Sequence, residues 1–219
     1  MSAIAIQLEV WGADACFSRP EFKVERVSYD FITPSAARGI LESVFWHPGL
    51  KWHIDRIHVL APIQFANIRR NEVSAKISAR NVQTAMKSGA PLYLATAEHI
   101  QQRATMVLKH VRYIIEAHFS MTDKASPGDN PGKFQDIVKR RIQRGQFYSM
   151  PYFGTREFPA FFAEAKEIPR CHETLKGKRD FGYMLYDMDY SDPENIRPQF
   201  FSAILRDGVL NLTNVEVKG

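Results

Sequence analysis

The sequence predicts an α+β protein with a ferredoxin-like βαββαβ core and a small antiparallel β extension. Several short runs alternate apolar and polar residues, as half-buried strands do, and two segments carry apolar residues at helical spacing. These segments occur in the order strand, helix, strand, strand, helix, strand, an order that RNA-recognition modules share. We therefore expect a core over residues 1–154 and a β-rich extension over residues 155–219.

The first strand and the first helix have clear local signals. Residues 4–10 alternate apolar and polar side chains and predict a strand. The polar, basic stretch 17–32 predicts a loop with at most a short strand near 22–28. A helix follows, because Thr33 is a suitable N-cap and Pro34 suits the first helical position. Its apolar stripe consists of Ala37, Ile40, Leu41, Val44 and Phe45.

The middle of the chain predicts three further elements. Residues 51–65 indicate a strand with a local irregularity, and 63–77 indicate a second strand that could form a hairpin with it. The periodicity weakens over 78–104, which we interpret as an insertion or long loop with a short helix near 95–102. Residues 105–119 are rich in Val, Ile, Tyr and Phe and predict a long central strand, with a helix as the alternative.

The core is predicted to end with a helix and a strand. Asn130 and Pro131 are typical of a helix start, and Gly145 of a helix end. The run 147–154 has the composition of a strand and would complete the core.

The extension contains two strand-like runs, residues 181–190 and 199–212. The dipeptide Asp207-Gly208 lies between apolar residues of the second run and is a strong hairpin signal.

Composition and charge limit the classes of function. The 219 residues are 45% hydrophobic and 24% charged, as in ordinary globular proteins. A net charge of +5 favours a polyanionic partner. Cys16 and Cys171 are far apart and match no zinc or disulfide pattern. The N-terminus does not have the pattern of a signal peptide, and no apolar run approaches the roughly 20 residues that span a bilayer. We therefore expect a cytoplasmic protein without a membrane partner.

Basic residues gather in two places that could contact a nucleic-acid backbone. The second helix carries Arg140, Arg141 and Arg144, and the loop before the first helix carries Arg19, Lys23 and Arg26. For the second helix, an ordinary solvated face is the alternative, since cations near a helix C-terminus also complement the helix dipole.

The sequence contains no GxGxxG, Walker, HExxH or GxSxG pattern, so the usual signals of nucleotide hydrolysis, zinc proteolysis and serine hydrolysis are absent. Lys109 and His110 remain as candidates. A histidine can move a proton near neutral pH, and a lysine can stabilise charge on a phosphoryl oxygen. Adjacent strand residues point to opposite faces, so both would act on one phosphate only at a strand end or a bulge. A merely exposed histidine is the alternative.

Longer stretches resemble a known family. The run VERVSYDFITPSAARGILE, together with QQRATMVLKHVRYIIEA, RGQFYSMPYFGTREF and FGYMLYDMD, is similar to the fifth family of CRISPR-associated proteins in its type I-C subtype. The resemblance spans nearly the whole chain. It implies a ferredoxin-like domain with a β-rich extension. It also implies an endoribonuclease that cleaves the CRISPR transcript near the base of each repeat stem-loop, without a metal or other cofactor, and then keeps the 5′ handle in a surveillance complex.

The resemblance also implies an active centre. In this family a tyrosine near the end of the first helix is expected to act with a Lys-His pair on a later strand. Lys109 and His110 match the pair, with His110 as general acid/base and Lys109 as electrostatic stabiliser, whereas Phe45 stands at the tyrosine position. Phenylalanine cannot exchange a proton, so the tyrosine's role is dispensable here, or His47 or Tyr29 replaces it, or this member cuts weakly.

Two rival functions follow from the same observations. One is a non-catalytic subunit that binds the 5′ end of guide RNA. The other, which rests on charge alone, is a general duplex-DNA binder with no preference for repeat sequence. The expected partners are CRISPR repeat RNA and other subunits of a type I-C complex, with DNA as an alternative.

Overall fold

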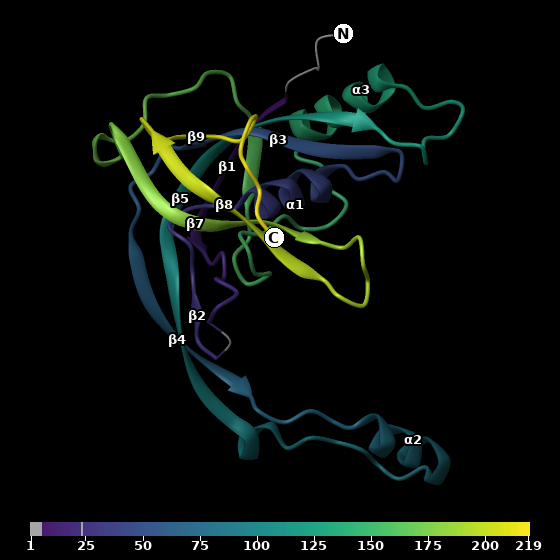
Figure 1. The fold of residues 1–219 in the computed structure, drawn as a ribbon. Helices are drawn as coiled ribbons and strands as arrows, with labels where there is room; N and C mark the ends of the chain where they lie inside the picture. Colours follow the sequence, from purple (N-terminus) through teal and green to yellow (C-terminus); the bar gives the residue numbers. More distant parts are fainter. Residues whose placement is uncertain (1–5, 23) are drawn as a thin grey trace.

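The computed structural model describes residues 6–22 and 24–219, which form a mixed α/β fold around one mostly antiparallel sheet (Figure 1). The strands are β1 (Ile6–Ala15), β2 (Arg26–Val27), β3 (Leu50–Val59), β4 (Phe65–Val73), β5 (Ile100–Met121), β6 (Phe161–Glu164), β7 (Lys178–Asp189), β8 (Arg197–Arg206) and β9 (Val209–Asn211). The helices are α1 (Pro34–Val44), α2 (Ala79–Ser88) and α3 (Pro131–Gln143), with 3-10 turns η1 (Thr96–His99) and η2 (Glu173–Leu175). No helix among the described residues is both long and apolar enough to cross a membrane.

The strands β6, β1, β5 and β3 are neighbours in that order, and each pair is antiparallel. Helices α1 and α3 pack against each other and against this part of the sheet, so that their apolar residues join the strands in one core. The expected strand over 4–10 corresponds to β1, although residues 4 and 5 lie outside the described residues. The short strand expected near 22–28 is confirmed as β2, which runs parallel to β5.

Both predicted helix starts are confirmed. The Thr33 hydroxyl accepts a hydrogen bond from the Ala36 amide at 3.2 Å, and the Asn130 side chain accepts one from the Lys133 amide at 2.9 Å. These caps satisfy amides that the first helical turn leaves free. The α1 residues Ala37, Ile40, Leu41 and Val44 are buried, as the stripe predicted. After α3 the chain turns at Gly145, whose φ of 61° is left-handed.

The long strand β5 is also confirmed, but the hairpin expected between 51–65 and 63–77 is wrong. Strands β3 and β4 lie one after the other along the same edge of β5. Val59 is opposite Tyr113, and Phe65 is opposite Leu108. The chain therefore continues along β5 between these strands and does not reverse. The alternation of apolar and polar residues is the same in either arrangement, so it could not identify the partner. The irregularity expected in β3 is confirmed as a register shift between Ile54 and Arg56.

The segment 78–104 is more regular than expected. It contains α2, the 3-10 turn η1 in place of the helix expected near 95–102, and the first residues of β5. Strand β4 and the first half of β5 form a ribbon that carries α2 away from the body, as the lower part of Figure 1 shows. The helix α2 could not be predicted from an apolar stripe, because none of its residues is buried.

The strand expected over 147–154 is wrong. These residues form a loop that contains Pro151 and a left-handed Gly154. The fourth strand of the core is β6, a few residues further along the chain. The hairpin at Asp207-Gly208 is confirmed, since both residues have positive φ angles between β8 and β9. Strand β9 pairs with β3, so the extension's strands continue the sheet of the core.

Candidate functional site

The junction between the end of α1 and α3 brings together three of the predicted site residues, Phe45, His47 and Arg141. The Phe45 ring packs on Phe134 of α3 at 5.6 Å between centroids. The Arg141 guanidinium lies 5.3 Å from the centre of the Phe45 ring and donates a hydrogen bond of 2.6 Å to the carbonyl of Val44. Phe45, which stands where the family is expected to have a tyrosine, therefore lies beside the charge of Arg141 but supplies no proton itself.

His47 is held in a defined orientation at this junction. Its Nδ1 accepts a hydrogen bond from the Gly49 amide at 3.0 Å, so the proton of the neutral ring lies on Nε2. That Nε2 is 3.8 Å from Oδ2 of Asp129, and the ring packs 4.9 Å from the Phe134 ring. The side chain is partly exposed and can reach a ligand.

Asp129 links His47 to a lysine. Its second carboxylate oxygen accepts a hydrogen bond of 2.8 Å from Nζ of Lys133. Lys133 and then the Ser126 amide hold the pKa of the Asp129 carboxyl below its usual range, so this group is ionised at neutral pH. A histidine, a carboxylate and a lysine therefore lie in one connected group. The sequence did not indicate this group, because residues 47, 129 and 133 share no motif spacing.

The junction carries the parts that metal-free phosphodiester cleavage requires. His47 can move a proton, while Lys133 and Arg141 can stabilise negative charge on a phosphoryl group. Trp46 beside it is 60% exposed, a large aromatic surface on which a base could stack. Arg140 on α3 and the C-cap residue Arg144 are exposed and extend the positive surface. In the described ranges, no group of three or more His, Cys, Asp or Glu side chains is arranged to hold a metal ion.

The structure places Lys109 and His110 elsewhere. Both lie in β5, where Phe119 reaches the junction by packing on Phe134 at 6.4 Å. Lys109 is ten residues further back along the strand, or about 30 Å at 3.3 Å per residue. The structure therefore does not bring this pair together with Phe45 and His47.

Lys109 and His110 also have different neighbours. Lys109 is opposite Asp14 on β1, and its Nζ lies 2.5 Å from the Asp14 carboxylate. His110 is exposed and lines a shallow hollow with Trp11 and Arg112. The strand is irregular at this point, since His110 has a φ of 51°. The strand therefore has an irregularity that would allow Lys109 and His110 to face one phosphate. Even so, Lys109 is bound to Asp14 and does not line the hollow beside His110.

The basic residues before α1 are mostly paired. Arg19 binds Asp30 at 3.0 Å and lies over the ring of Tyr29, which is buried. Arg26 lies within 4 Å of carboxylates of Glu72 and Glu157. Lys23 lies outside the described residues. Tyr29 is therefore not one of the junction's residues, and Arg19 and Arg26 carry less free charge than α3.

Comparison with known proteins identifies the family. The family model Cas_Cas5d, described as CRISPR-associated protein (Cas_Cas5), matches residues 5–213. The chain belongs to the Cas5d family. The resemblance found in the sequence is thereby confirmed. A protein of Mannheimia succiniciproducens named CRISPR pre-crRNA endoribonuclease Cas5d is 48% identical over 214 residues, which cover 94% of each chain. A Thermus thermophilus protein of the same name is 38% identical, over 94% of this chain and 90% of its own.

The fold occurs in solved structures as well. A crystal structure of a CRISPR-associated protein matches with a TM-score of 0.70 and 19% identity, over 99% of this chain and 97% of that one. At this identity the match establishes the shared fold and nothing about residue roles.

Proposed function

We propose that this Cas5d-family chain is an endoribonuclease that cleaves CRISPR repeat RNA within pre-crRNA, near the base of the repeat's stem-loop. The observation that carries the proposal is the 48% identity, over 94% of both chains, with a relative named for that activity. The cytoplasm is the proposed location, since both cysteines are free thiols, as is usual in a reducing compartment.

We also infer that the core is a ferredoxin-like domain. In chain order its strands are β1, β3, β5 and β6, separated by α1 and α3 in the βαββαβ pattern. In the sheet they lie in the order fourth, first, third, second. We also propose that the chain divides into this core and a β-rich extension, with the boundary after β6 (Phe161–Glu164) and not at the expected residue 154.

The proposed reaction is attack of a ribose 2′-hydroxyl on the adjacent phosphorus. The bond between O2′ and phosphorus forms, the bond from phosphorus to O5′ breaks, and the products are a cyclic phosphate and a 5′-hydroxyl. The 2′-hydroxyl loses its proton, and the leaving oxygen gains one. We assign a proton transfer to His47, and charge stabilisation on the phosphoryl oxygens to Lys133 and Arg141. No step in this scheme requires a metal.

Lys109 and His110 remain the alternative centre. His110 is exposed beside Arg112, and these two groups would supply the same pair of functions. Arg112 is bound to Glu9 at 2.7 Å and Lys109 to Asp14, and Lys133 of the junction is likewise paired with Asp129. The junction has in addition Arg141, which donates to the Val44 carbonyl and is paired with no carboxylate among the described residues. The geometry therefore favours the junction of α1 and α3.

After cleavage, we propose that the chain retains the 5′ handle within a type I-C surveillance complex. The exposed Arg140 and Arg144 are the proposed contacts with the RNA backbone, with smaller contributions from Arg19 and Arg26.

The test is cleavage of an end-labelled cognate repeat hairpin in EDTA. We compare the wild-type protein with His47→Ala and Lys133→Ala, and separately with Lys109→Ala and His110→Ala. Lys139→Ala removes a charge from the same helix and is the matched control for Lys133→Ala. Loss of the cut in the first pair alone supports the junction, whereas loss in the second pair alone assigns the reaction to Lys109 and His110. Tight binding by the wild-type protein without any cut would leave a handle-binding subunit.

A further inference from the structure

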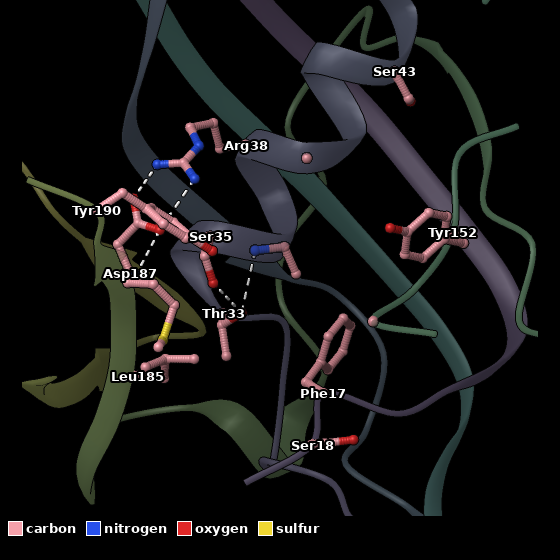
Figure 2. Close-up of a pocket in the computed structure, with 14 residues that line it drawn as sticks. Phe17, Ser18, Thr33, Ser35, Arg38, Ser43, Tyr152, Leu185, Asp187 and Tyr190 are labelled. Atoms are coloured by element: carbon pink, nitrogen blue, oxygen red, sulfur yellow. Dashed lines mark hydrogen bonds and ion pairs between the residues drawn. The ribbon is translucent and has the colours of Figure 1, made fainter. Parts of the chain in front are cut away.

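A hollow of about 440 Å³ lies along α1, between that helix, strand β7 and the loop 152–154 (Figure 2). Its wall carries the hydroxyl groups of Ser18 and Ser35. Figure 2 shows Tyr152 on the side opposite Tyr190. The volume is within the range of pockets that hold small molecules, and the wall combines aromatic rings with short polar groups. Neither the junction nor the Lys109–His110 centre includes these residues.

The charges beside the hollow do not favour a phosphate. Arg38 donates hydrogen bonds to both carboxylate oxygens of Asp187, one of them at 3.0 Å, and its Nε lies 3.3 Å from Glu42. Two carboxylates therefore surround one guanidinium, and the local charge is not positive. Because Asp187 occupies both terminal nitrogens of the guanidinium and Glu42 lies beside Nε, its flat face is the part that remains for a ligand. A flat, uncharged group suits this environment better than an anion.

We propose that this hollow holds one unpaired base of the RNA, an inference that rests on the proposed function. Proteins recognise single-stranded RNA by stacking splayed bases on aromatic rings or guanidinium planes and by hydrogen bonds to the base edges. Tyr152, Tyr190 and Arg38 supply the stacking surfaces, and the hydroxyls of Ser18 and Ser35 supply edge contacts. The phosphates of that nucleotide lie outside the hollow.

The hollow is close to the proposed catalytic junction. Ser43 lines the hollow, its carbonyl accepts a hydrogen bond from the Tyr148 amide, and it is two residues before Phe45. From Gly39 to Phe45 the chain advances about 9 Å at 1.5 Å per helical residue. One RNA strand can therefore place a base in the hollow while a neighbouring phosphate reaches His47. The base held there would fix which phosphate is cut.

Gly39 offers a way to fill the hollow without disturbing the fold. It is exposed on α1 and lines the hollow, and a Cβ built there meets no atom within 4 Å. Gly39→Leu therefore adds a side chain into free space. The matched control is Gln83→Leu, which adds a leucine to an exposed position of the remote helix α2.

The test is a double-mutant cycle, in which each protein variant is combined with each modified RNA. The Kd of fluorescein-labelled cognate repeat RNA is measured by anisotropy, together with RNAs in which each unpaired nucleotide in turn is abasic. Because stacking of a base on protein side chains contributes to single-strand affinity, we expect one abasic RNA to bind the wild-type protein about tenfold more weakly, or about 1.4 kcal/mol. Gly39→Leu should bind intact RNA about tenfold more weakly, with no further loss for that abasic RNA. Gln83→Leu should match the wild-type protein on every RNA.

Two results would overturn the inference. One is a Gly39→Leu protein that binds all the RNAs like the wild-type protein, and the other is an equal loss on a fully base-paired RNA. Cleavage in the same samples separates this inference from the proposed function. A wild-type protein that binds but does not cut removes the nuclease proposal, while the abasic cycle still tests the hollow. If the wild-type protein cuts the RNA and the Gly39→Leu protein binds and cuts it normally, only the proposed base pocket is rejected.

Discussion

His47 is the residue on which the proposed chemistry depends most. Its ring is oriented by the Gly49 amide and lies beside the Asp129–Lys133 pair. General acid–base catalysis typically contributes 10²–10⁴-fold. We therefore expect His47→Ala to lower the single-turnover cleavage rate by about 10²–10⁴-fold, with RNA affinity changed by less than about threefold. His99→Ala, on the outlying ribbon, is the control. A cleavage rate within a few-fold of wild type would remove His47 from the mechanism.

A second histidine affects stability. Burial lowers the pKa of His53 below its ordinary value of 6.5, and the charges of His118 and Lys51 add to this, while Asp55 opposes it. Below about pH 6.5 the unfolded chain binds this proton more readily than the folded chain, so stability present above that pH is lost as the pH falls.

Urea unfolding at pH 7.5 and pH 5 tests this effect. We expect His53→Gln to lose less stability than the wild-type protein over this interval, because the variant lacks the unfavourable protonation. His172→Gln, in the exposed 3-10 turn region, should follow the wild-type protein. Equal losses in His53→Gln and wild type would show that His53 does not contribute.

Helix α1 supports both the proposed junction and the hollow, so its caps and its glycine matter at the scale of the element. The Thr33 hydroxyl caps the helix, and replacing such a cap by alanine costs about 0.5–2 kcal/mol. Gly39 is in the interior of the helix, where alanine is favoured by about 0.5–1 kcal/mol. We expect Thr33→Ala to lower the free energy of unfolding and Gly39→Ala to raise it. Denaturant titration of both variants beside the wild-type protein checks the opposite signs.

The segment that carries α2 should contribute little to the stability of the protein. The amide of Ser74 donates to the carbonyl of His99 at 2.9 Å, which closes the base of the segment that carries α2. None of the α2 residues is buried. Replacing residues 75–98 by a short turn should therefore leave the melting temperature within about 3 °C of wild type, because surface changes away from buried groups have small effects. A large fall in a circular dichroism melt would show that α2 packs against the body.

Elements held by local interactions could be predicted from the sequence, whereas those that depend on distant parts of the chain could not. Helices α1 and α3 could be predicted because Thr33, Pro34, Asn130 and Pro131 act within one turn of the chain. The partner of β4 could not, because strand periodicity indicates a face and not a neighbour. At the candidate site, Phe45, His47 and Arg141 were predicted one by one, but their contact with Asp129 and Lys133 depends on how α3 packs.

Positive charge is distributed unevenly over the whole molecule, and the salt dependence of RNA binding should reveal this. Arg140 on α3 and Arg144, the C-cap of that helix, are both exposed, and within the described residues neither side chain forms a salt bridge. Each phosphate contact on a single strand contributes about 0.7 to the slope of log K against log salt. We expect the double variant Arg140→Ala/Arg144→Ala to reduce this slope by about 1 to 1.5 for repeat RNA. Lys166→Ala/Arg170→Ala is the control pair, and an equal reduction there would indicate unspecific attraction.

Cleavage of the labelled repeat hairpin in EDTA by wild-type protein, His47→Ala and His110→Ala decides between the two candidate centres. We expect one cut by the wild-type protein that persists in EDTA, is lost in His47→Ala with binding retained, and remains in His110→Ala. A wild-type protein that binds the hairpin tightly and never cuts it, or a cut that only His110→Ala abolishes, would show that the junction is not the active centre.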